Sequence, residues 1–192
     1  KQVSTSQKTR NQSFSQLDII VGGFLATQKS HTISLHSRIV SRMQVKYSVK
    51  ESTIPNGGKG LFAEQFIPKG SLIWKFDRDN VAVYTRKGIE TYLASLPYEE
   101  ACKYAMYIYG EVGAGKDCAV YELDDGRYFN HSDTPNVVCK VEGTPDCFAT
   151  RDIQKGEELF VDYHEFDEYD WIHALKDKYS IWGPHKPIKS KL

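Results

Sequence analysis

Two short segments of the chain concentrate the side chains that could do chemistry. Residues 127–136 read RYFNHSDTPN and combine aromatic rings, amides and an imidazole, with neither helical nor strand periodicity. Buried amides and imidazoles must be hydrogen-bonded, so such a segment is costly to fold unless its side chains meet partners. Further along, GEELFVDY at 156–163 is typical of a strand that ends at Asp162 and Tyr163. We therefore expect the two segments to form one site that holds a ligand and carries out a reaction.

The elements that must position these segments are predicted to be mainly strands. Residues 45–49 alternate apolar and polar side chains, a pattern typical of a half-buried strand. Residues 54–58, which read IPNGG, favour a loop because several of them prefer turns or positive φ angles. Helix formers prevail from Thr85 to Tyr109, where Pro97 divides two predicted helices. Further strands are predicted at 60–63, 71–76, 118–123, 136–141, 146–151 and 157–163.

Four segments of different character are predicted along the chain. Residues 1–43 are rich in Ser, Thr and Gln, and the first 42 carry six Lys/Arg and a single acid. We expect this segment to be disordered, transit-like, or upstream of a start at Met43. Residues 44–166 form the main domain. Residues 167–182 form a helix because apolar side chains recur at helical spacing, and residues 183–192 form a basic tail.

Composition limits the classes of partner. Lys+Arg and Asp+Glu number 25 each, so the net charge gives no reason to expect direct binding of nucleic acid. Beyond residue 42 there are 19 basic and 24 acidic residues, a mild acidity that suits a basic peptide and equally suits an ordinary surface. No run of 18 apolar residues predicts a membrane span. The four cysteines form no CxxC pair, so no metal site is expected; free thiols are the default, with a disulfide left open.

Three segments resemble, in order, the signature motifs of SET-domain protein lysine methyltransferases. They are GKGLFA at 58–63, RYFNHS at 127–132 with the following Pro135-Asn136, and GEELFVDY at 156–163. The resemblance covers roughly residues 45–165. It implies the SET-domain fold, which is mainly β with a few helices and small curved β-sheets. The C-terminal strand would be threaded beneath the preceding segment as a pseudoknot, an exception to the rule that chains are unthreaded.

The resemblance also implies S-adenosylmethionine as the methyl donor. Asn130 can donate and accept hydrogen bonds and His131 can fix its ring by one nitrogen, which suits the amino-acid and adenine groups of that cofactor. Gly58 and Gly60 let the backbone approach a ligand closely, although an ordinary turn explains them equally well. Arg127 is more readily explained by an ion pair with one of the acids that precede it. The implied cofactor-binding residues are Gly58, Lys59, Gly60, Leu61, Arg127, Asn130, His131 and Tyr163.

Tyr163 is the predicted catalytic residue. Transfer of a methyl group from a sulfonium to an amine is an in-line displacement, and alignment of nitrogen, methyl and sulfur supplies much of the catalysis. A phenol, with a reference pKa of about 10, can orient the methyl group or the amine without net charge. The substrate lysine must be neutral, and the neighbouring sulfonium favours the neutral amine, so no strong base is needed.

The channel for the substrate lysine is predicted to be aromatic. The family often has a cysteine after the Asn-His-Ser motif and a cysteine-rich zinc motif beyond the catalytic tyrosine, but here Asp133 takes the first position and no cysteine follows Cys147. The C-terminal helix would then close the channel, although its aromatic spacing fits plain core packing equally well. The predicted channel residues are Tyr128, Phe129, Phe160, Phe166, Tyr169 and Trp171.

Other functions stay open beside transfer to a lysine of a histone or another protein. A non-catalytic SET-like interaction module would share these motifs. An Fe(II) oxygenase could use His131 and Asp133 with His173 or His185 as a two-histidine, one-carboxylate set, although the strand order shows no clear jelly roll. A homodimer is also left open. We expect an intracellular protein of the nucleus or cytoplasm, or of an organelle if residues 1–42 are a transit segment.

Overall fold

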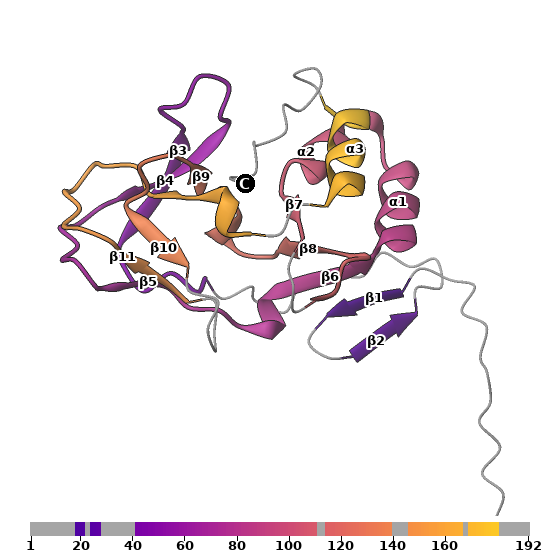
Figure 1. Ribbon diagram of the computed structural model, residues 1–192, viewed down its shortest axis with the longest axis horizontal. Helices are drawn as coiled ribbons and strands as arrows, with labels where there is room; N and C mark the ends of the chain where they lie inside the picture. Colours follow the sequence, from indigo (N-terminus) through magenta and orange to yellow (C-terminus); the bar gives the residue numbers. More distant parts are fainter. Residues whose placement is uncertain are drawn as a thin grey trace, which may run out of the picture.

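The computed structural model describes residues 18–21, 24–27, 41–110, 114–139, 146–166 and 169–180. These residues form several small β-sheets and three α-helices, which confirms the predicted class of a mainly β fold with a few helices. Figure 1 shows the smallest sheets gathered on one side of the domain and the helices packed together on the other. Within the described residues, no helix combines the length and apolar character needed to cross a membrane.

The side with the small sheets contains two antiparallel units. β3 (Tyr47–Glu51) pairs with β4 (Lys59–Ala63), and β10 (Val137–Cys139), β11 (Cys147–Ala149) and β5 (Leu72–Trp74) form a second sheet in that order. These are the strands that alternation and apolar runs predicted, although most are shorter than expected. Their inward side chains form a core that we call the strand core. Its fully buried members include Leu61, Ile67, Ile73, Val137, Ile153 and Leu159.

The helical side is built on a separate sheet. β6 (Val81–Thr85) follows the short 3₁₀ helix η1 (Arg78–Asn80) and pairs with β8 (Cys118–Glu122), which also pairs with β7 (Ile108–Tyr109). Two helices come between them, α1 (Arg86–Ser95) and α2 (Tyr98–Ala105), and Pro97 separates them as predicted. The Thr85 hydroxyl caps α1 by accepting a hydrogen bond from the Gly88 N–H.

The C-terminal helix α3 (Asp170–Lys178) is shorter than the predicted 167–182. Its apolar stripe buries Ile172 and Leu175 against α1 and α2 in a second core, which we call the helical core. Phe166 lies before the helix and packs on the strand core. Residues 167–168 and 181–192, including the predicted basic tail, lie outside the described residues.

The N-terminal zone contributes a hairpin that the sequence analysis did not predict. β1 (Asp18–Val21) pairs with β2 (Phe24–Thr27) and with β6, so these two strands extend the sheet beneath the helices. In the sequence, two short apolar runs separated by Gly22-Gly23 are a hairpin signal. The expectation of a disordered zone is therefore wrong for β1 and β2. The rest of residues 1–40 lies outside the described residues.

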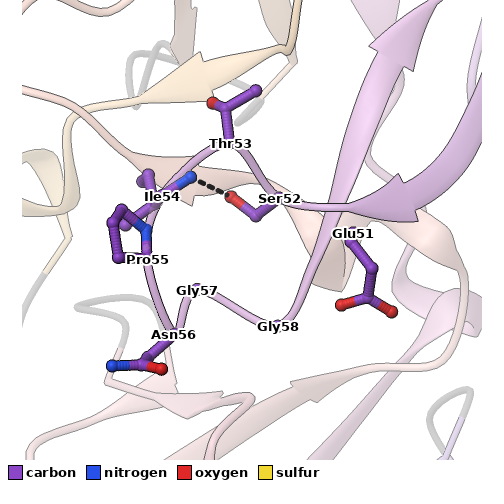
Figure 2. Close-up of a pocket in the computed structure, with 8 residues that line it drawn as sticks. All are labelled: Glu51, Ser52, Thr53, Ile54, Pro55, Asn56, Gly57 and Gly58. Carbon is purple, nitrogen blue, oxygen red and sulfur yellow. Dashed lines mark hydrogen bonds between the residues drawn. The ribbon is translucent and has the colours of Figure 1, made fainter.

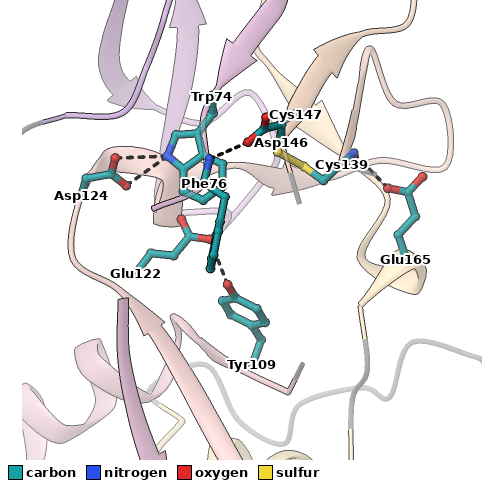
Figure 3. Close-up of a disulfide and its surroundings, with 9 residues drawn as sticks. All are labelled: Trp74, Phe76, Tyr109, Glu122, Asp124, Cys139, Asp146, Cys147 and Glu165. Carbon is teal, nitrogen blue, oxygen red and sulfur yellow. Dashed lines mark hydrogen bonds between the residues drawn. A yellow bond between two sulfur atoms is a disulfide. The ribbon is translucent and has the colours of Figure 1, made fainter. Parts of the chain in front are cut away.

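A disulfide joins two of the four cysteines. Cys139 and Cys147 face each other on the paired strands β10 and β11 and are bonded, so the default expectation of free thiols is wrong for this pair. Cys102 and Cys118 are free. Figure 3 shows the bond beside Trp74, whose indole N–H donates to the buried carboxylate of Asp124. The sheet that carries Cys139 is thereby tied to the end of β8, where Asp124 begins the 3₁₀ helix η3 (Asp125–Tyr128).

The segment that ends at Tyr163 runs between two distant parts of the chain. On one side, Glu158 bridges to Phe62 and the Leu159 N–H donates to the Leu61 carbonyl. On the other side, β12 (Phe160–Val161) pairs in parallel with β9 (Asn130–His131). This arrangement brings the 130–131 dipeptide beside the C-terminal strand, as the predicted pseudoknot requires.

Asn136 fastens this segment from the side. Its side-chain amide, only 2% exposed, donates to the Glu158 carbonyl at 2.8 Å and accepts from the Phe160 N–H at 2.8 Å. One amide therefore satisfies two backbone groups that a neighbouring strand would otherwise satisfy.

Asn136→Ala should lower the free energy of unfolding by about 2 to 4 kcal/mol, because it leaves both backbone groups unpaired in a dry environment. Urea denaturation monitored by circular dichroism measures this loss. Thr134→Ala, in the exposed part of the same turn, is the matched control and should change stability by less than about 0.5 kcal/mol. An equal effect of the two substitutions would contradict the role given to Asn136.

Candidate active site

Tyr163 is held at two points by the segment that contains the Asn130-His131 pair. Its hydroxyl donates to the Phe129 carbonyl at 2.7 Å, and its backbone N–H donates to Nδ1 of His131 at 3.1 Å. The ring centroids of His131 and Tyr163 lie 5.4 Å apart. The structure thus brings the phenol beside the asparagine–histidine turn. It also ends β12 earlier than predicted, because Asp162 caps the 3₁₀ helix η4 (Tyr163–Glu165) by accepting from the His164 N–H.

Phe129 contributes its carbonyl rather than its ring. The side chain is 8% exposed and packs in the strand core, and its place in the channel stays a prediction. The Phe129 carbonyl accepts a hydrogen bond from the Tyr163 hydroxyl. The phenol oxygen of Tyr163 keeps its capacity to accept a hydrogen bond. The orientation of the phenol is therefore set by backbone.

Glu158 connects three segments that are far apart in the sequence. Its side chain, 4% exposed, accepts hydrogen bonds from the Ser52 hydroxyl, from the N–H and hydroxyl of Thr53, and from the Asn130 amide at 3.0 Å. Burial raises the pKa of this carboxyl, but the hydrogen bonds from Thr53, Asn130 and Ser52 outweigh it and lower the pKa below its ordinary value. Glu158 was not among the predicted site residues. Its position gave no signal, because a carboxylate that alternates with buried Leu159 and Val161 is typical of the exposed face of a strand.

The Glu158 carboxylate leaves no room for a side chain at position 60. A Cβ at position 60 would lie 2.1 Å from Oε1 of Glu158 and 3.2 Å from Nδ2 of Asn130. The Asn130 amide also donates to the Lys59 carbonyl at 2.9 Å. The close approach at Gly60 is thus made by protein side chains, whereas the predicted reason was approach of a ligand.

The turn between β3 and β4 borders a cavity of about 410 Å³ that is lined by residues 51–58 (Figure 2). Gly58 lines it with φ at +66°, a left-handed conformation that favours glycine, and Asn56 has φ at +61°. The other predicted residues of this motif lie elsewhere. Leu61 is fully buried in the strand core, and the Lys59 side chain pairs with Glu51.

Arg127 makes structural contacts. Its guanidinium donates to the carbonyls of Leu123 and Asp124 and to the Tyr128 hydroxyl, and it lies 4.0 Å from Asp125. These bonds close the turn that precedes Asn130. They agree with the structural explanation of Arg127 rather than with direct contact to a cofactor.

The predicted aromatic channel residues divide between the two cores. Tyr128 and Phe166 pack on the strand core together with Tyr163, while Phe160 lies on β12 beside Asn130. Trp171 instead packs on the helical core, where its indole N–H donates to the Lys116 carbonyl and its ring faces Arg86. Tyr169 also packs on the helical core. These contacts agree with core packing, the other explanation of the helical spacing, and a role of Tyr169 and Trp171 in the channel wall stays a prediction.

The iron set considered in the sequence analysis is not assembled by the described residues. Oδ1 of Asp133 lies 3.4 Å from Nε2 of His131, but His173 lies on α3, which packs on the helical core, and His185 is outside the described residues. His131 instead lies close to Asp162 and His164. Burial raises the pKa of Asp162, but hydrogen bonds and charge from His164 and the charge of His131 outweigh it and lower that pKa.

Comparisons with known proteins agree with this geometry. The family model of the SET domain matches residues 58–164, which is more than half of the chain. The chain therefore belongs to the SET-domain family.

Individual relatives are distant. N-lysine methyltransferase KMT5A-A of Danio rerio is 30% identical over 142 residues, which make up 71% of this chain and 39% of that protein. Polycomb Repressive Complex 2 of Chaetomium thermophilum, autoinhibited and bound to S-adenosylmethionine, matches 69% of this chain and 16% of its own chain, with 20% identity and a TM-score of 0.50. The methyltransferase domain of human histone-lysine N-methyltransferase SETMAR matches 62% of this chain and 45% of its own, with 21% identity and a TM-score of 0.43. At such identities the structural likeness concerns the fold alone.

Glu158→Gln should remove the part of the unfolding free energy that depends on pH through the Glu158 carboxylate. Because the folded pKa lies below the ordinary 4.5, the charged carboxylate stabilises the fold above about pH 5, and this contribution is lost as pH falls through the folded pKa. The difference in unfolding free energy between wild type and variant, from urea titrations between pH 7 and pH 3, should shrink toward low pH. Glu99→Gln, on the exposed face of α2, controls for the loss of one carboxylate. A difference independent of pH would refute this role of Glu158.

Proposed function

We propose that this chain is an S-adenosylmethionine-dependent methyltransferase that acts on the ε-amine of a lysine in a protein substrate. The observation that carries the proposal is the two-point attachment of Tyr163, whose hydroxyl and backbone N–H bind partners on either side of Asn130. Family membership and the name of the Danio rerio relative, an N-lysine methyltransferase, support the same reaction. Because the chain spans 39% of that relative, activity, substrate and partners are matters for experiment.

The cavity beside Gly58 fits a cofactor of this kind. Its volume of about 410 Å³ lies within the range typical of small-molecule sites. Asn56 and Gly58 line the cavity with positive φ angles. The N–H groups of the Asn130 amide bond Lys59 and Glu158, so its side-chain oxygen is the group that it could offer to a ligand. S-adenosylmethionine would supply an electrophilic methyl group on a sulfonium. Gly58, Asn130 and His131 are the residues that would hold it.

Tyr163 would align the reaction. With its proton committed to the Phe129 carbonyl, the phenol oxygen can serve as an acceptor for the polarised C–H groups of the methyl or for an N–H of the amine. Such alignment lowers the barrier of an in-line displacement without a charged group near the reacting atoms. The proton of the lysine would leave to water.

A cationic substrate suits the surroundings of Tyr163. Asp133 and Asp162 lie within the two segments that meet at the phenol, Glu165 follows the second by two residues, and the Asp133 side chain is 90% exposed. These acids would attract a basic peptide, such as a lysine-rich tail of a histone or another protein, and this attraction should weaken with salt. A substrate of this kind would place the protein in the nucleus or the cytoplasm.

Tyr163→Phe should lower methyl transfer by about 100-fold or more, because the ring remains but the oriented oxygen is lost. The assay measures transfer of a radiolabelled methyl group from S-adenosylmethionine into a whole-cell extract or a lysine-peptide array. The labelled residue is then identified by mass spectrometry. Isothermal titration should show cofactor binding by the variant within about threefold of wild type.

Tyr98→Phe, which removes a hydroxyl from an exposed tyrosine of α2, is the matched control and should transfer methyl groups at the wild-type rate. Retained activity of Tyr163→Phe would refute the assignment of Tyr163. Saturable cofactor binding by wild type without methylation of any lysine would instead favour the non-catalytic interaction module.

A further inference from the structure

Two histidines and an aspartate gather beside Tyr163. One ligand atom each from His131, Asp162 and His164 lies within 4.8 Å of the other two. Oδ1 of Asp162 is 2.6 Å from Nδ1 of His164 and 3.6 Å from Nδ1 of His131, and the two imidazole centroids are 5.2 Å apart. All three side chains are half-buried, with 19–26% of each exposed. The group is thus preformed and accessible to an ion.

Two imidazoles and one carboxylate are a donor set suited to zinc. Zinc takes such ligands at about 2.0 to 2.2 Å in tetrahedral geometry, which places ligand atoms roughly 3.3 Å apart. The separation of 3.6 Å already matches, and that of 2.6 Å must widen by less than about 1 Å. Capping of η4 accounts for the contact between Asp162 and His164. The bond of Nδ1 of His131 to the Tyr163 N–H brings the second imidazole, from another strand, to the same carboxylate.

We propose that His131, Asp162 and His164 form a binding site for a divalent zinc ion. A neutral imidazole has one lone pair, and Nδ1 of His131 uses it to accept the Tyr163 N–H. Coordination of Nδ1 therefore replaces that hydrogen bond. Nδ1 of His164 is a ligand in the tautomer that carries the ring proton on Nε2. Zinc binding is thereby coupled to the backbone attachment of Tyr163, the attachment on which the proposed methyl transfer also depends.

The test uses the full chain, freed of metal with EDTA and titrated with zinc chloride in a non-coordinating buffer. Isothermal titration should show one zinc ion per chain. His164→Asn should weaken binding at least about tenfold, as loss of a ligand costs no less than loss of a residue that supports one. Cobalt(II) as a substitute ion should give the visible absorption of a tetrahedral site in wild type only. His173→Asn, which removes a histidine of α3, should retain the wild-type affinity and spectrum.

A second readout follows the Tyr163 amide by NMR. Zinc should shift the Tyr163 N–H signal and hasten its exchange with solvent in wild type, and leave it unchanged in His164→Asn. Equal zinc affinity of wild type and His164→Asn, or equal losses in the two histidine variants, would overturn the site. An unchanged Tyr163 amide in zinc-bound wild type would overturn the coupling. Neither readout requires methyltransferase activity, so failure here is distinguishable from failure of the proposed function.

Discussion

The buried carboxylate of Glu158 is the constraint on which the rest of the site depends. A charged group at 4% exposure is tolerated only when hydrogen bonds replace its water, and its donors come from residues 52–53 and from Asn130. The turn before β4, the asparagine–histidine dipeptide and the C-terminal strand must therefore assemble together. Gly60 follows from the same constraint, because its missing side chain leaves the room that Oε1 of Glu158 fills.

A parallel pairing of two residues is too short to hold a strand in place by itself. β9 and β12 are such a pair, and the amide of Asn136 supplies the bonds that a longer ladder would have supplied. The amide selects one register of the strand, because it donates to the Glu158 carbonyl and accepts from the Phe160 N–H. An apolar contact would tolerate other registers. Register between Asn130 and Phe160 is fixed in this way, and with it the distance from His131 to Tyr163.

Local patterns predicted the elements whose causes are local. Alternation in 45–49 and the proline between α1 and α2 act over a few residues, and both predictions were confirmed. The 157–163 strand was predicted too long because its end is set by Asp162, which bonds its own backbone as a cap, and its start by the distant Asn136. The pairing of β1 with β2 was not predicted although its signal was local, because the two apolar runs are short and lie in a segment rich in Ser, Thr and Gln.

The same division between local and distant causes applies to the site. Residue types identified Asn130, His131 and Tyr163 as groups that need partners, yet the hydrogen bonds that hold Asn130 and Tyr163 come from residues distant in sequence. Tyr163 receives its two attachments from residues 129 and 131, so a shift of that segment moves the phenol and its backbone together. Because His131 is the backbone attachment and also faces Asp162 and His164, any ligand that takes its lone pair acts on the orientation of the phenol. The geometry that would align a methyl transfer is thus the geometry through which it could be controlled.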